Sequence, residues 1–134
     1  MSMNYIKKVP TPQELQDIIP MTAELKDLKA ERDKEIRKVI TGESDKFLMI
    51  IGPCSADNET AVLDYVSRLA KVAEKVQDKM IVIPRIYTNK PRTTGKGYKG
   101  MLHQPDPEKA PDLFEGVKAI RKMPIDAVKE TGLT

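Results

Sequence analysis

The sequence Phe-Leu-Met-Ile-Ile at residues 47–51, followed by Gly52 and Pro53, decides the fold class of this chain. Five apolar residues stand in a row with no polar residue between them, which is typical of a strand that is buried on both faces. Gly52 and Pro53 end the run, because both residues favour turns over continued strand structure. Strands buried on both faces occur mainly in parallel sheets that helices cover. The run therefore predicts an α/β fold.

A helix and a second strand follow this first strand. Asp57 or Asn58 can cap the helix. Its apolar residues recur at intervals of four, three, four and three, so they form one face: Val62, Val66, Leu69, Ala73 and Val76. Residues 80–87 predict another buried strand, although Pro84 lacks the N–H that a central strand needs. A strand, a crossover helix and a second strand predict a parallel, right-handed βαβ unit.

Two helices are predicted before this unit. Thr11, Pro12 and Glu14 have the spacing of a capping box with proline at the first helical position, and they predict a helix over residues 13–19. Thr22 can cap a longer helix that ends at Gly42. Residues 29–34 are almost all charged, so this longer helix is either mostly solvated or broken there. We interpret residues 1–44 as an N-terminal helical arm rather than as part of the core.

A last helix is predicted over residues 112–131, after a long loop from residue 88 to about residue 109. Gly132 ends this helix, and Pro124 in its second half is expected to kink or break it. The predicted order is arm, strand, helix, strand, loop and helix. Two strands cannot bury both faces of a parallel sheet by themselves. We therefore expect these residues to be the opening portion of a larger α/β fold.

The composition is that of an ordinary globular chain of 134 residues, about one small domain. Twenty-three lysines and arginines against twenty acidic residues leave a formal net charge of +3, which is too small to indicate nucleic acid as a partner. The longest apolar run has five residues, far short of the roughly 18 that a membrane span requires. Cys54 is the one cysteine, which excludes an internal disulfide. We expect a cytoplasmic protein with neither nucleic acid nor a membrane as partner.

A positively charged segment begins at the second predicted strand. Residues 79–105 contain no acidic residue but six cationic ones: Lys79, Arg85, Lys90, Arg92, Lys96 and Lys99. Lys90 and Arg92 flank Pro91, which favours extended backbone at the residue before it and would place both cations on one side. Thr93 adds a hydroxyl donor. The segment predicts a phosphate pocket beyond the carboxyl end of the strand, where arginine can bind an anion bidentately.

Each feature also has a simpler interpretation. A basic, glycine-containing loop is often only solvated, and if it bound nucleic acid only Tyr87 and Tyr98 could stack on bases. Cys54 is either an inert buried thiol or, because it follows the carboxyl end of a strand, a group at the position where barrel enzymes keep catalytic residues. His103 is expected on an exposed loop. The two tyrosines are interpreted as packing residues. Arg85 is predicted inside a strand, where a cation needs an anionic partner.

Two segments together resemble one enzyme family. They are Ile-Gly-Pro-Cys-Ser at residues 51–55 and Pro-Arg-Ile-Tyr-Thr-Asn-Lys-Pro-Arg-Thr-Thr at residues 84–94, with Gly-Tyr-Lys-Gly at 97–100. They are similar to segments of 3-deoxy-D-arabino-heptulosonate 7-phosphate (DAHP) synthases, in the class with an N-terminal extension and feedback control by aromatic amino acids. The Lys-Pro-Arg-Thr-Thr stretch at this spacing is the specific part. The resemblance extends over the whole chain.

The resemblance implies a fold and an activity. The family folds as a (β/α)8 barrel, which takes roughly 250 residues. On this basis residues 1–44 are the N-terminal extension, and residues 45–134 are the first two β/α units of a barrel, ending before strand three. The implied reaction is the condensation of phosphoenolpyruvate with erythrose 4-phosphate, the first step of the shikimate pathway. A divalent metal assists it as a Lewis acid on the aldehyde oxygen.

The resemblance also implies roles for individual residues. Arg85 and Lys90 match positions that bind phosphoenolpyruvate. Lys90, Pro91, Arg92 and Thr93 match the segment that holds erythrose 4-phosphate. Lys90 therefore lies between the two substrates and is the predicted catalytic residue.

Cys54 matches the metal-ligating cysteine of the family, and a thiolate with harder ligands suits Mn, Fe, Co or Zn. The other metal ligands, a histidine, a glutamate and an aspartate, come from later strands of the family, and His103 does not match that histidine. We expect these 134 residues alone to retain no metal and to be inactive. The intact enzyme is expected to be a dimer or tetramer, or to need a complementing C-terminal chain. The alternative is an inert fragment or interaction module that only associates with a complementary or full-length synthase chain.

Overall fold

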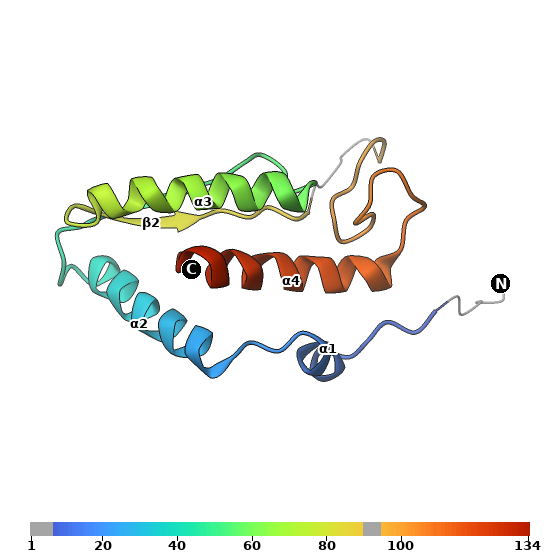
Figure 1. The fold of residues 1–134 in the computed structure, drawn as a ribbon, viewed down its shortest axis with the longest axis horizontal. Helices are drawn as coiled ribbons and strands as arrows, with labels where there is room; N and C mark the ends of the chain where they lie inside the picture. The colour runs from blue at the N-terminus through green and yellow to red at the C-terminus, as the bar shows by residue number, and fades with distance from the viewer. Residues whose placement is uncertain (1–6, 90–94) are drawn as a thin grey trace.

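The computed structural model describes residues 7–89 and 95–134. Within these residues the chain forms four helices and two strands, in the predicted order (Figure 1): α1 (Pro12–Ile18), α2 (Ala23–Ile40), β1 (Phe47–Ile51), α3 (Glu59–Val76), β2 (Met80–Pro84) and α4 (Leu113–Thr131). None of the described helices is both long and apolar enough to cross a membrane.

The two strands pair in parallel, as predicted, with Phe47 opposite Met80 and Ile51 opposite Pro84. β1 has the predicted bounds, but β2 ends at Pro84 and not at residue 87. The reason is the length of β1. The N–H of Arg85 still donates to the carbonyl of Ile51 at 2.8 Å, and beyond that bond β1 has ended. Arg85 therefore lies just after the strand, and its predicted place within the strand is wrong.

The core lies between α3 and α4. The predicted apolar face of α3 is confirmed, with Val62 and Val66 fully buried. The side chain of Asn58 caps α3 by accepting the N–H of Ala61 at 2.9 Å. α3 and α4 lie side by side and run opposite to β2 (Figure 1). The buried residues of this cluster come from both helices and from the loops beside them: Ala56, Val62, Val66, Met101, Met123, Ala127 and Leu133.

β1 is not buried on both faces, contrary to the prediction from its apolar run. Phe47 and Ile50 are 60% and 63% exposed, and Ile51 is 40% exposed. β2 pairs along one edge of β1, and α3 packs chiefly on β2, where Ile81 and Val82 are buried. Within the described residues, the elements that contact β1 therefore leave part of its hydrophobic surface uncovered.

α4 continues through Pro124, so the expected break does not occur. Proline removes one backbone hydrogen bond of the helix. On either side of it, Met123 and Ala127 are each only 1% exposed, and their burial in the core holds the helix together. The predicted ends are confirmed: Asp112 caps the first turn, and Gly132 ends the helix with a positive φ of 69°.

The N-terminal arm has no buried residue in α1 or α2. Thr11 forms the predicted capping box with Glu14, and Thr22 caps α2. α2 is unbroken at residues 29–34, where Lys29 pairs with Asp33 and the helix is solvated. The arm lies beside α4 on the side away from α3 in Figure 1.

Three cations tie the arm to the rest of the chain. Arg121 donates from Nε to the carbonyl of Ile19 at 2.8 Å. Arg32 of α2 donates from Nη2 to the carbonyl of Val82 in β2 at 3.0 Å. Near the start of the described residues, Lys7 forms an ion pair with Asp112 at 3.2 Å. The arm thus makes polar contacts with the rest of the chain and contributes no residue to the hydrophobic core.

Candidate functional site

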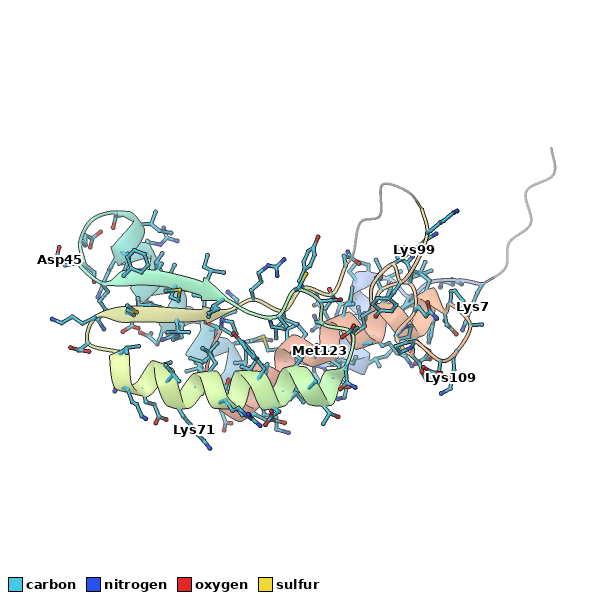
Figure 2. All side chains as sticks on the ribbon, turned by 90° about the horizontal axis from the view of Figure 1, so that it is seen from above. Lys7, Asp45, Lys71, Lys99, Lys109 and Met123 are labelled. Carbon is cyan, nitrogen blue, oxygen red and sulfur yellow. The ribbon has the colours of Figure 1, made fainter. Side chains whose placement is uncertain are left out.

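The candidate site lies where the two parallel strands end at the same edge of the sheet (Figure 2). β1 leads into Gly52, Pro53 and Cys54, and β2 leads into Arg85. Parallel strands bring their carboxyl ends together, and in α/β folds ligands bind at this edge. The structure therefore places two of the predicted site residues, Cys54 and Arg85, on neighbouring loops.

The two loops approach so closely that only glycine fits at position 52. A Cβ atom built on Gly52 would lie 1.9 Å from the carbonyl oxygen of Arg85. The backbone of Gly52 does not have a positive φ, so it is the close approach that requires glycine here. One residue later, the carbonyl of Pro53 accepts a hydrogen bond from Nη1 of Arg85 at 3.1 Å.

The guanidinium of Arg85 is held by two groups, neither of which carries a formal charge. One is the carbonyl of Pro53, and the other is the ring of Tyr87, whose centroid lies 4.3 Å from Cζ of Arg85. Arg85 is exposed, and among the described residues no carboxylate lies within ion-pair distance of it. Its positive charge is therefore oriented but not neutralised, which is the arrangement that binds an anionic ligand.

Sequence reasoning did not find the role of Tyr87, which it interpreted as a packing residue. Arg85 and Tyr87 are two residues apart in a stretch that the sequence predicts as a strand, where side chains at this spacing lie on the same side of the chain. That spacing was the available signal. The contact between the guanidinium and the ring face could be recognised only from the structure.

Cys54 is exposed, which contradicts its interpretation as an inert buried thiol. A thiol can ligate a metal or react only if the ligand can reach it. However, protein metal sites usually need three or more side-chain ligands. The described residues contain no group of three or more histidine, cysteine, aspartate or glutamate side chains placed to hold one ion. These residues alone do not fit a metal site.

The loop after β2 is anchored on both sides of residues 90–94. Asn89 and Gly100 form an antiparallel bridge, and the N–H of Met101 donates to the carbonyl of Thr88 at 2.8 Å. Gly95, Gly97 and Gly100 have positive φ angles. Four predicted site residues lie outside the described residues: Lys90, Pro91, Arg92 and Thr93.

The flanks of this loop are basic and partly packed. Lys96 and Lys99 are exposed, and His103 lies on an exposed turn as expected. Tyr98 is half-buried, in line with a packing role, and burial together with the nearby Asp57 carboxylate raises the pKa of its hydroxyl. Lys96 and Lys99 thus present positive charge to solvent. Like Arg85, both follow β2 in the sequence.

Comparison with known proteins gives one family. The sequence profile described as the DAHP synthetase I family matches residues 19–125. The Phe-sensitive phospho-2-dehydro-3-deoxyheptonate aldolase of Escherichia coli K12 is 32% identical over 128 residues, which are 96% of this chain and 36% of that protein. The tyrosine-inhibited aldolase of Candida albicans is 34% identical over 131 residues, 98% of this chain and 35% of that protein.

A solved structure agrees with these sequence relatives. The phospho-2-dehydro-3-deoxyheptonate aldolase from Francisella tularensis SCHU S4 superposes with a TM-score of 0.88 at 26% sequence identity. The match covers 98% of this chain and 38% of that chain. This chain thus spans a little more than a third of the length of the proteins it resembles.

Proposed function

Since the chain belongs to the DAHP synthetase I family, we propose that it is the N-terminal part of a 3-deoxy-7-phosphoheptulonate synthase. That enzyme condenses phosphoenolpyruvate with erythrose 4-phosphate in the shikimate pathway. The family match, the two named aldolases and the likeness to the solved aldolase support this proposal. We propose a cytoplasmic enzyme that forms a homo-oligomer, and feedback control by an aromatic amino acid, as the names of the relatives state for those proteins.

We propose the same division of the chain that the sequence predicts. Residues 1–44 are an N-terminal helical extension, and residues 45–134 are the first two β/α units of a (β/α)8 barrel. Two features support this. The arm contributes no buried residue from α1 or α2, whereas α3 and α4 share one core and α3 also packs on β2. β1 and β2 are parallel and joined through α3, as in a barrel of this kind.

The observation that carries the function is the environment of Arg85. Both substrates are phosphorylated anions, so their site needs cations that are not already neutralised by protein carboxylates. Arg85 meets this requirement at the carboxyl end of β2, where the Pro53 carbonyl and the Tyr87 ring orient it. We assign Arg85 to phosphoenolpyruvate. An arginine presents several N–H donors in one plane and can bind a phosphate or a carboxylate bidentately.

Residues farther along the same loop and a residue after β1 complete the proposed site. Lys90, Pro91, Arg92 and Thr93, which begin five positions after Arg85, would bind erythrose 4-phosphate, with Lys90 as the catalytic residue between the two substrates. A divalent metal, Mn, Fe, Co or Zn, belongs to the whole enzyme in this proposal. Cys54 is the donor that we assign to it from this chain. The further donors that a metal site needs have to come from residues other than the described ones.

Steady-state kinetics of the full-length synthase test this assignment. Arg85→Ala should raise the KM for phosphoenolpyruvate by about tenfold or more, because a charge-assisted hydrogen bond contributes roughly 1.5–3 kcal/mol. Arg85→Lys keeps the charge but loses the planar fork, so its KM for phosphoenolpyruvate should lie between those of the wild type and Arg85→Ala. Arg37→Ala removes an exposed arginine of α2 and is the matched control. Absence of phosphoenolpyruvate consumption that depends on erythrose 4-phosphate in the wild type would refute the proposed function. Wild-type constants in Arg85→Ala would refute the site.

The second candidate function is a non-catalytic module that associates with a complementary synthase chain. The exposed residues of β1 favour it, because Phe47, Ile50 and Ile51 present an apolar surface that needs a cover. Size-exclusion chromatography of the 134 residues, with and without a chain that supplies the later strands, distinguishes the non-catalytic module from part of a split enzyme. Joint elution without synthase activity would favour the module, and joint elution with activity would favour the split enzyme.

A further inference from the structure

We propose that Tyr87 is a positioning residue, whose ring face holds the guanidinium of Arg85 in the orientation that binds the anionic group of the substrate. This inference rests on the proposed function of Arg85 and extends it by one residue. The ring centroid of Tyr87 lies 4.3 Å from Cζ of Arg85, well within the distance of a cation–π contact.

The ring can act as a fixed platform because the backbone of Tyr87 is anchored on both sides. The carbonyl of Tyr87 accepts the N–H of Ala56 at 2.9 Å, and Ala56 is itself only 1% exposed. The next carbonyl, that of Thr88, accepts the N–H of Met101, a buried residue of the following loop. Tyr87 is therefore joined to the loop after β1 and to the loop around residue 101.

The two contacts of Arg85 constrain different degrees of freedom. The ring of Tyr87 covers one side of the guanidinium carbon, and the carbonyl of Pro53 fixes the direction of one N–H by accepting from Nη1. Neither group carries a formal negative charge, so the cation stays available to an anion. Ordering a long side chain before the ligand arrives reduces the entropy that binding has to lose.

The contact requires an aromatic ring but not the phenolic hydroxyl. Among the described residues the hydroxyl of Tyr87 makes no hydrogen bond, whereas the ring face contacts Arg85. Phenylalanine has a similar electron-rich face, so it should replace tyrosine here. An aliphatic side chain of similar size should fill the space without orienting the cation. This difference separates a positioning role from simple packing.

The test measures kinetics of the full-length synthase for Tyr87→Leu, Tyr87→Met and Tyr87→Phe, with each substrate varied separately. We expect the leucine and methionine variants to raise the KM for phosphoenolpyruvate about two- to fivefold, the size of an exposed cation–π contact, and to leave that for erythrose 4-phosphate unchanged. Tyr87→Phe should stay within about twofold of the wild type. In the Arg85→Ala background, Tyr87→Leu should have no further effect.

Each other outcome contradicts the inference in a distinct way. Wild-type KM values in both aliphatic variants mean that the ring does not orient Arg85. An equal loss in the wild-type and Arg85→Ala backgrounds, or the absence of a cooperative thermal transition in both aliphatic variants, assigns Tyr87 a structural role instead. If Arg85→Ala itself has wild-type constants, the proposed function of Arg85 fails, and this result is separate from any result at Tyr87.

Discussion

At the scale of single residues, the site depends on the absence of a side chain at position 52. Gly52 allows the backbone of the loop after β1 to lie against the carbonyl of Arg85, and this approach brings the Pro53 carbonyl within 3.1 Å of the guanidinium. Any side chain at position 52 would occupy space that the Arg85 backbone already fills. One glycine therefore sets both the packing of the two loops and the orientation of a candidate binding residue.

Gly52→Ala should disturb stability and binding together. The added Cβ would lie 1.9 Å from the Arg85 oxygen, so the two loops have to separate. We expect a loss of about 1–3 kcal/mol in the free energy of unfolding, the usual cost of overpacking, and a raised KM for phosphoenolpyruvate. Urea unfolding and steady-state kinetics of the full-length synthase measure the two effects.

Gly116→Ala is the matched comparison for this change. A Cβ there would lie 1.8 Å from the carbonyl oxygen of Leu102, at the start of α4, so it creates a similar clash away from Arg85. We expect it to reduce stability without changing the KM for phosphoenolpyruvate. If both alanine variants raised that KM equally, the effect of Gly52→Ala would reflect general destabilisation and not the orientation of Arg85.

At the scale of elements, α4 shows how burial overrides local preference. Pro124 lies within the helix, yet the helix extends from Leu113 to Thr131. Proline in a helix interior is about 3 kcal/mol less favourable than alanine. The neighbouring residues Met123 and Ala127 are among the most buried in the described chain. Packing of this face outweighs the missing hydrogen bond.

Pro124→Ala should therefore stabilise the chain. Alanine restores the N–H that can donate to the carbonyl four residues earlier, and it removes the clash of the proline ring with that turn. We expect the free energy of unfolding to rise by about 1–3 kcal/mol, measured by urea denaturation. Pro111→Ala lies outside the helix and is exposed, so it should change stability little. An unchanged or lower stability in Pro124→Ala would show that packing of the proline ring offsets the helical cost.

At the scale of the whole molecule, one hydrophobic cluster joins α3 and α4, while the arm is attached by polar contacts. Met123 and Val66 are the largest fully buried side chains of the described residues, and both belong to this cluster. Figure 2 labels Met123 on α4, near the middle of the molecule. The cluster includes Ala56 and the partly buried Ile86, which belong to the loops after β1 and β2, and so it supports the loops that carry the candidate site.

Met123→Ala should weaken the whole unit. Truncation of a buried methionine to alanine costs about 2–5 kcal/mol, through lost burial and the cavity that remains. We expect a single, less stable unfolding transition, measured by thermal and urea denaturation of the 134-residue chain. Leu113→Ala, on the same helix but 44% exposed, is the control and should have a small effect. Equal losses in the two variants would contradict the assignment of the core to the α3–α4 contact.

The features that the sequence alone determined are local ones. The bounds of β1, the caps at Thr11 and Thr22 and the glycine end of α4 were predicted correctly, because each depends on residues within a few positions of one another. The parallel pairing also followed from a strand, a helix and a strand in succession. Cys54 was found as a candidate from its position after an apolar run, and Arg85 as a cation that was predicted to lie within the second strand.

Only the tertiary structure decided the features that depend on distant parts of the chain. β2 ends at Pro84 because β1, more than 30 residues earlier, is no longer beside it. Part of β1 is exposed because no other element covers it within the described residues. α4 remains continuous through Pro124 because its neighbouring residues are buried in the core. The Arg85 guanidinium contacts both the Pro53 carbonyl and the Tyr87 ring. Backbone preference acts between neighbours in sequence, whereas burial, close approach and the pairing of a charge depend on neighbours in space.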